Sequence, residues 1–171
     1  MEPKICDKII NYFETQATQY RGVTSHGFIS NNKVSTDATF LDEELYLEYF
    51  TNLQKIFDEY KNIYPMVNYY SPWGITENVN IQRYNPAEGY FAWHSERVTA
   101  HPPDSTRHMV FMTYLNNISD GGETEFYHQE LKVKPEKGLT LVWPADWTFT
   151  HRGCVSNTET KYIITGWANY Q

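Results

Sequence analysis

The run "GYFAWHSERV" at residues 89–98 places a histidine and a glutamate two positions apart, next to an aromatic segment. Residues i and i+2 of an extended strand project from the same face, so His94 and Glu96 can reach one shared target. An imidazole and a carboxylate on one face are two ligands for a transition metal. A second imidazole from a distant strand would complete a set that suits Fe(II), because three neighbouring coordination positions stay open.

His151 is the best candidate for the third ligand. It follows "VWPADWTFT" and begins the turn "HRG", and Lys161 opens another strand ten residues later. Alternate residues from Lys161 to Trp167 share one strand face, so this lysine emerges from a mostly apolar wall. An interior lysine is costly unless it is paired, and a dicarboxylate ligand would supply the partner.

Each of these residues also has an ordinary structural interpretation. A lone histidine on a strand is more often a satisfied or surface residue than a ligand. Glu96 could form a salt bridge with Arg97 or Arg107, and Lys161 could be the exposed first residue of its strand. We expect three further histidines to lie at the surface or behind the site: His26, His108 and His128. His101 and Asp104 are close enough in sequence to replace Glu96 as ligands, but the run "AHPPD" predicts a loop and disfavours them.

Two segments that could support such a site have helical periodicity. Residues 4–17 and 42–61 repeat apolar side chains at helical spacing. Pro3 suits the start of the first helix, and the acidic run from Asp42 to Glu44 suits the start of the second. Both segments are therefore predicted to be amphipathic helices, each with one face on a flat partner.

From about residue 78 the periodicity changes to two, which predicts short strands. No helix intervenes, so an antiparallel sandwich or barrel is expected, with the helices packed outside it. Residues 63–77 lack clean periodicity and are predicted to be a long loop. The expected strands are 79–84, 89–94, 108–115, 123–127, 131–133, 139–143, 148–151 and 161–169.

Four runs in this part of the chain carry a resemblance to a known family. They are "RYNPAEGYFAWHSE", "RHMVFMTYLN", "GGETEFY" and "HRGCVSNTETKYIITGW". In this order they resemble the prolyl 4-hydroxylase-type branch of the Fe(II)/2-oxoglutarate-dependent dioxygenases, over residues 79–169. The resemblance implies a double-stranded β-helix, the jelly roll of cupin-like proteins, which agrees with the strand pattern: a mainly β fold flanked by amphipathic helices.

The resemblance also implies residue roles. His94, Glu96 and His151 would bind iron. Lys161 would pair with the distal carboxylate of 2-oxoglutarate, Tyr114 would donate a hydrogen bond to the same group, and Tyr84 would reach the cosubstrate near the metal. Arg107 and Trp167 match residues near the substrate in this family.

Glu96 stands where the family usually has aspartate. Its carboxylate is one methylene longer, so it reaches iron only if the side chain folds back or the strand shifts. Metal preference should survive, because both residues supply a carboxylate oxygen.

The implied activity is hydroxylation of a substrate with O₂, with release of succinate and CO₂ from 2-oxoglutarate. The substrate would be a prolyl residue of a peptide or protein, or a small molecule. Loops 63–77 and 97–106 are the expected lid, and several aromatic residues could stack on proline rings: Tyr69, Tyr70, Trp73, Trp143 and Trp147. Two alternatives stay open: a non-catalytic jelly-roll binding module, and a cupin-like metal enzyme that does not use 2-oxoglutarate.

Length and composition bound the remaining expectations. The chain of 171 residues predicts a single domain, with supporting helices and a loop over 1–65 and a catalytic jelly roll over 78–171. The formal net charge of -7 disfavours nucleic acid as a partner. No signal peptide or membrane-spanning run is evident, so a soluble cytoplasmic protein with reduced cysteines is expected. The oligomeric state does not follow from these residues.

Overall fold

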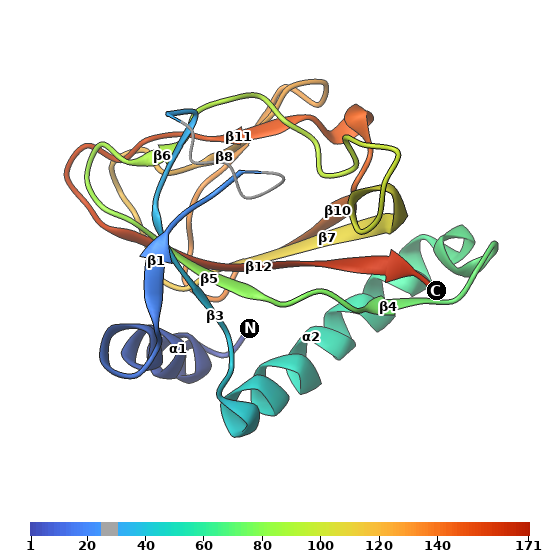
Figure 1. Ribbon diagram of the computed structural model, residues 1–171, viewed down its shortest axis with the longest axis horizontal. Coiled ribbons are helices and arrows are strands. Elements are labelled where there is room, and N and C mark those ends of the chain that lie inside the picture. Colours follow the sequence, from blue (N-terminus) through green and yellow to red (C-terminus); the bar gives the residue numbers. More distant parts are fainter. Residues whose placement is uncertain (25–30) are drawn as a thin grey trace.

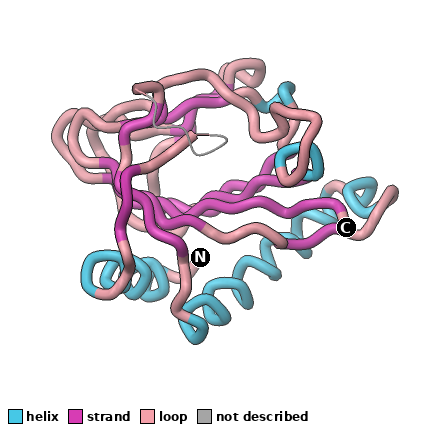
Figure 2. Tube along the Cα trace, in the orientation of Figure 1, coloured by secondary structure: helices cyan, strands magenta, loops and turns pink. Residues whose placement is uncertain are grey.

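Two helices cover one face of a large antiparallel sheet, and smaller sheets face its other side (Figure 1). The computed structural model describes residues 1–24 and 31–171. His26, predicted to lie in a surface loop, falls outside the described residues. Figure 2 shows the same arrangement, with helices confined to the periphery and strands in the centre.

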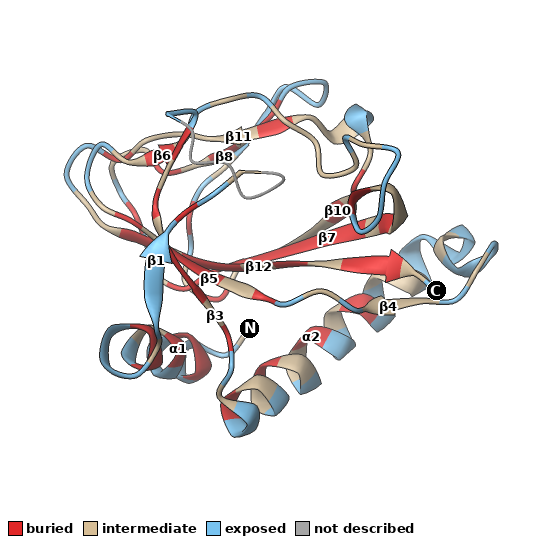
Figure 3. Cartoon of the chain, in the orientation of Figure 1, coloured by how far each residue is buried: buried red, intermediate tan, exposed pale blue. Residues whose placement is uncertain are grey.

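Both helices lie where the apolar periodicity predicts them. Helix α1 spans Pro3–Thr15, with its proline in the first turn, and α2 spans Glu43–Ile63. The Asp42 side chain caps α2 by accepting a hydrogen bond of 2.9 Å from the Leu45 amide. Each helix buries one face on the sheet and exposes the other (Figure 3).

The major sheet has the order β1-β3-β5-β12-β7-β10, and β4 pairs with the far end of β12. Its central strand β12 pairs with β5 on one side and β7 on the other, which sets Lys161 opposite Tyr84 and Ile163 opposite Tyr114. The strands are β1 (Gln19–Arg21), β3 (Thr36–Thr39), β4 (Trp73–Ile75), β5 (Asn80–Tyr84), β7 (Arg107–Tyr114), β10 (Thr140–Pro144) and β12 (Lys161–Tyr170).

The opposite layer consists of two short sheets joined through histidine backbones. One has the order β11-β8-β9, and the other pairs β2 with β6. An antiparallel bridge between His94 and His151 connects them. The strands are β2 (Lys33–Val34), β6 (Gly89–Tyr90), β8 (Thr124–Phe126), β9 (Leu131–Val133) and β11 (His151–Gly153).

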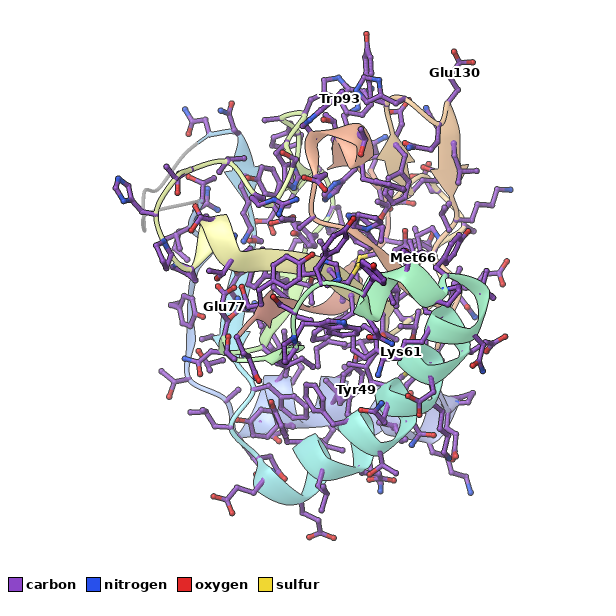
Figure 4. The ribbon with its side chains drawn as sticks, turned by 90° about the vertical axis from the view of Figure 1, so that its right-hand side faces the viewer. Tyr49, Lys61, Met66, Glu77, Trp93 and Glu130 are labelled. Carbon is purple, nitrogen blue, oxygen red and sulfur yellow. The ribbon has the colours of Figure 1, made fainter. Side chains whose placement is uncertain are left out.

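The alternation of side chains along β7 separates two hydrophobic cores. Phe111 faces the helices, whereas Val110 and Met112 face the space between the sheets. Tyr49 of α2 is fully buried in the helix-side core and its hydroxyl lies 2.8 Å from the Thr113 hydroxyl. In Figure 4, α2 and Tyr49 lie toward the opposite end of the molecule from Trp93.

The mainly β, jelly-roll prediction is confirmed, but several element assignments were wrong. Residues 1–65 hold three strands besides the helices, since β1, β2 and β3 lie within that range. The segment 63–77, predicted as a loop, contains a 3₁₀ turn at Pro65–Asn68 and strand β4. These strands are too short for a period of two to be visible, and their pairing is fixed by distant partners.

Two predicted strands differ at their ends. The strand expected at 89–94 is regular only at Gly89–Tyr90, before the bridge at His94. The strand expected at 148–151 begins at His151, because Trp147–Phe149 forms a 3₁₀ turn. Among the described residues, neither helix has the length and apolarity needed to cross a membrane.

Candidate active site

A cavity of about 540 Å³ lies between the two layers of strands. Its walls come from both layers, and its lining contains all but one of the residues predicted to do chemistry. These are Tyr84, His94, Glu96, Arg107, His151, Lys161 and Trp167. The exception, Tyr114, lies behind the wall.

The predicted metal ligands converge at one point of this cavity. The Glu96 Oε1 atom lies 3.6 Å from His94 Nε2 and 3.4 Å from His151 Nε2. One ligand atom from each residue lies within 4.8 Å of the other two. The spacing at 94 and 96 and the bridge to β11 therefore assemble two imidazoles and a carboxylate.

Backbone carbonyls fix the tautomer of both histidines. His94 Nδ1 lies 2.9 Å from the Ala92 carbonyl oxygen, and His151 Nδ1 lies 2.9 Å from that of Phe149. A carbonyl only accepts, so Nδ1 carries the proton and a neutral ring keeps its lone pair at Nε2. Burial, reinforced by the nearby His151, lowers the pKa of His94 to about 4. At neutral pH a bare nitrogen lone pair faces the carboxylate, an arrangement that a bound cation stabilises.

The second oxygen of Glu96 is held by other groups. Trp167 Nε1 donates a 3.0 Å hydrogen bond to Glu96 Oε2, and Arg107 Nη1 lies 3.9 Å from the same oxygen. Burial alone would raise the pKa of Glu96, but the positive charge of Arg107, joined by His94 and His151 whenever these are protonated, lowers it below its usual value. The ionised carboxylate thus offers only Oε1 to the histidines.

Arg107 is committed to the protein rather than free for a substrate. It forms a two-pronged pair with Glu77, at 2.9 and 2.7 Å, and a pair with Asp104 at 3.1 Å. Its guanidinium lies 3.9 Å from the centroid of the Trp167 ring, and it donates to the Glu96 backbone carbonyl. Because most of its donors are occupied by protein groups, Arg107 lines the cavity as a support for the carboxylate and the indole.

Lys161 is a buried cation without a carboxylate partner among the described residues. It is 6% exposed, so the alternative of a solvent-exposed strand end is wrong. Its ammonium donates one hydrogen bond of 3.0 Å to the Gly122 carbonyl and lies 5.0 Å from the Tyr84 ring centroid. Burial lowers the pKa of Lys161 to about 8. A cation in this position favours an anionic ligand in the cavity.

The two tyrosines assigned to the cosubstrate differ from expectation. Tyr114 does not line the cavity, because its hydroxyl donates to Thr124 Oγ1 at 2.6 Å and accepts from the Thr124 amide at 3.1 Å. Thr124 itself lines the cavity. Tyr84 lines the cavity, but its hydroxyl donates to Gln82 Oε1 at 2.8 Å.

Other sequence candidates fall outside the site. His108 lies 3.1 Å from the Val67 carbonyl, and Arg97 pairs with Asp146, so Arg97 is not the partner of Glu96. In the lid segments, only Glu77 and the stretch Pro102–Asp104 line the cavity. Of the aromatic residues proposed to stack on prolines, only Trp143 lines the cavity; Tyr69, Tyr70, Trp73 and Trp147 lie elsewhere.

The part of the chain that carries this site matches a known protein family. The model of the 2OG-Fe(II) oxygenase superfamily matches residues 79–169, which contain every cavity-lining residue named above except Glu77. The chain belongs to the 2OG-Fe(II) oxygenase superfamily. Members of this superfamily use Fe(II) and 2-oxoglutarate, in agreement with the His94, Glu96 and His151 cluster.

Relatives of this oxygenase domain include prolyl hydroxylases. The probable prolyl 4-hydroxylase 9 of Arabidopsis thaliana is 28% identical over 119 residues, which are 56% of this chain and 41% of that protein. The chain thus spans less than half of that relative.

Three solved structures share the fold. The 2OG complex of the viral collagen prolyl hydroxylase of Paramecium Bursaria Chlorella virus-1 has a TM-score of 0.72 at 20% identity, covering 100% of this chain and 92% of that one. A Pseudomonas putida prolyl-4-hydroxylase scores 0.74 at 13% identity, with coverages of 100% and 89%. A Trichoplax adhaerens prolyl hydroxylase, in complex with a hypoxia inducible factor peptide, scores 0.73 at 18%, with coverages of 98% and 77%.

Replacing Lys161 by methionine should stabilise the ligand-free protein. The lowered pKa of Lys161 means that the folded state binds the ammonium proton less well than the unfolded state does. Below about pH 8 the lysine is charged in both states, and its full destabilising effect on the folded state is present. This penalty fades as the pH rises toward 10.5, the ordinary lysine value. We expect Lys161→Met to raise the free energy of unfolding by about 1–3 kcal/mol at pH 7, and by less at pH 10, in urea denaturation.

The matched control is Lys132→Met, because the Lys132 side chain is 57% exposed. It should change the free energy of unfolding by less than about 0.5 kcal/mol. Equal effects of the two substitutions would show that Lys161 is not a strained buried cation.

Proposed function

We propose that this protein is a hydroxylase that uses Fe(II), 2-oxoglutarate and O₂, and that its substrate is a prolyl residue of a peptide or protein. The observation that carries the proposal is the combination, in one cavity, of the His94, Glu96 and His151 cluster with a buried lysine that has no carboxylate partner in the described part of the chain. Iron and 2-oxoglutarate, when bound, supply the oxidation that replaces a substrate C–H by C–OH, with succinate and CO₂ as products.

The chain's own residues bind and orient these groups. His94 Nε2, His151 Nε2 and Glu96 Oε1 would hold the metal, because their lone pairs converge and their other polar atoms are already bonded. Lys161 would neutralise the distal carboxylate, and the Thr124 hydroxyl, which lines the same cavity, is a second donor for it. Both carboxylates of the cosubstrate would then meet a positive charge.

A substrate side chain can enter the same cavity. At about 540 Å³ it falls within the usual range for a small-ligand site and can take a dicarboxylate together with one side chain. The relatives named above are prolyl hydroxylases, and one was solved with a peptide fragment. We therefore favour a peptide or protein partner, and a single domain over 1–171 remains our prediction.

A cupin-like metal enzyme that does not use 2-oxoglutarate is the weaker candidate. It would account for the metal cluster but would leave the buried charge of Lys161 without a partner. A non-catalytic binding module would not require three converging metal ligands.

Turnover tests the proposal directly. The purified protein is incubated with Fe(II), 2-oxoglutarate, ascorbate and a panel of proline-containing peptides, with succinate and peptide mass as readouts. We expect succinate release that is stimulated by one peptide, which gains one oxygen atom. His151→Ala should abolish both. Succinate at the same rate in His151→Ala, or none from metal-loaded wild type with any peptide, would contradict the proposal.

Trp167 should support metal binding through Glu96. Trp167→Phe keeps an aromatic ring but removes the indole N–H, so Oε2 loses its hydrogen bond and the carboxylate is no longer held with only Oε1 toward the histidines. We expect the Fe(II) dissociation constant to rise about 10–100-fold in an anaerobic competition titration with a chromophoric chelator. The control is Trp73→Phe, which loses an indole bond to Asn68 outside the cavity. Equal affinities of the two variants would exclude this role.

A further inference from the structure

A second buried polar cluster borders the cavity and comes from strands outside the family match. Lys33 and Asp37 form an ion pair of 2.7 Å, and both are at most 4% exposed. Ser35 donates to the other carboxylate oxygen of Asp37 at 2.7 Å. The residues matched by the family model begin at 79, so this pair is a feature of the chain's own N-terminal strands.

The cluster is connected to Lys161 across three adjacent strands. Asp37 of β3 lies opposite Gln82 of β5, and Tyr84 of β5 lies opposite Lys161 of β12. Gln82 Nε2 donates to Asp37 Oδ2 at 3.2 Å, and Tyr84 donates to Gln82 Oε1 at 2.8 Å. Gln82 and Tyr84 are two residues apart on one strand face, so a row of hydrogen bonds runs from Asp37 to Tyr84, and the Tyr84 ring lies beside Lys161.

The direction of this row follows from the chemistry of its first member. The carboxylate of Asp37, paired with Lys33, only accepts hydrogen bonds. Gln82 must therefore turn its NH₂ group toward Asp37 and its carbonyl toward Tyr84, since the flipped amide would set two acceptors against each other. Tyr84 has one hydroxyl proton, and it is donated in the hydrogen bond to Gln82 Oε1. Burial and the charge of Asp37 raise the pKa of Tyr84 well above its usual value, so that proton stays in place.

We propose that Asp37 and Gln82 are positioning residues that fix the Tyr84 hydroxyl as a hydrogen-bond acceptor toward the cavity. This inference rests on the proposed function for its meaning, because it assigns which groups bind 2-oxoglutarate. The carboxylates of 2-oxoglutarate are acceptors and gain nothing from a second acceptor. Lys161 and Thr124 are then the donors to the distal carboxylate, while the Tyr84 ring supports the Lys161 ammonium 5.0 Å away.

The same geometry constrains the substrate side of the cavity. An atom that faces the Tyr84 oxygen must be a hydrogen-bond donor or apolar. A peptide amide N–H satisfies this condition, and so does a newly formed alcohol. The wall made by β3 and β5 thus selects against a second anionic group at this position.

The first test uses the protein without metal or cosubstrate. Tyrosine labelled with ¹³C at the ζ carbon is incorporated, and spectra are recorded in an equal mixture of H₂O and D₂O. A slowly exchanging hydroxyl proton splits the resonance, and Tyr84→Phe assigns it. We expect a split Tyr84 resonance in the wild type and a single one in Gln82→Met, which removes the acceptor at similar volume. A single resonance in the wild type would overturn the proposal.

The second test is a double-mutant cycle on 2-oxoglutarate affinity, measured anaerobically by calorimetry with the metal-loaded protein. Tyr84→Phe should change the dissociation constant less than threefold in the wild-type background. In the Gln82→Met background, where the hydroxyl is free to turn toward the cosubstrate, the same substitution should raise the dissociation constant of 2-oxoglutarate fivefold or more. A tenfold loss of 2-oxoglutarate affinity on Tyr84→Phe in the wild-type background, or equal losses of affinity in both backgrounds, would overturn the proposal.

Two controls keep the outcome decisive. If Gln82→Met fails to fold by circular dichroism, Asp37→Asn serves in its place, because an asparagine amide lets Gln82 turn. If wild-type protein does not bind 2-oxoglutarate, the proposed function fails, whereas the labelled-tyrosine spectrum still decides the orientation of Tyr84.

Discussion

The site depends on two backbone hydrogen bonds between His94 and His151. The amide of each residue donates to the carbonyl of the other, at 3.0 and 2.8 Å. These bonds attach the segment after β6 to β11 and bring together side chains that are far apart in sequence. Because each ring also donates through Nδ1 to a nearby carbonyl, the bridge fixes ring orientation as well as position. Without the bridge, Glu96 Oε1 would not face two imidazole nitrogens.

Strand β12 supplies the other half of the site. Its alternation directs Lys161 and Trp167 into one cavity, with Lys161 at the end near Tyr84 and Trp167 beside Glu96. The indole and Arg107 contact one oxygen of the glutamate and leave the other facing the histidines. The buried charges are unevenly matched: Lys33 and Arg107 have carboxylate partners, whereas Lys161 has none among the described residues. This imbalance favours binding of an anion.

Local pattern was sufficient for some of these features and not for others. The two-residue spacing of His94 and Glu96 and the parity from Lys161 to Trp167 are properties of single strands, so the sequence reveals them. Tyr114 has the same parity as the cavity-facing residues of β7, but parity does not show that Thr124 stands in front of it. The Asp37–Gln82 contact joins strands whose pairing depends on the whole sheet, and β3 is too short to show periodicity.

The central claim is that the cavity binds Fe(II) and 2-oxoglutarate together. An anaerobic titration of the metal-free protein with Fe(II), and then with 2-oxoglutarate, measures this through the visible absorption band of an iron-chelated keto acid. We expect a band that requires both components and saturates at one equivalent of each. Iron binding without the band would contradict the cosubstrate site, and binding of neither would contradict both assignments.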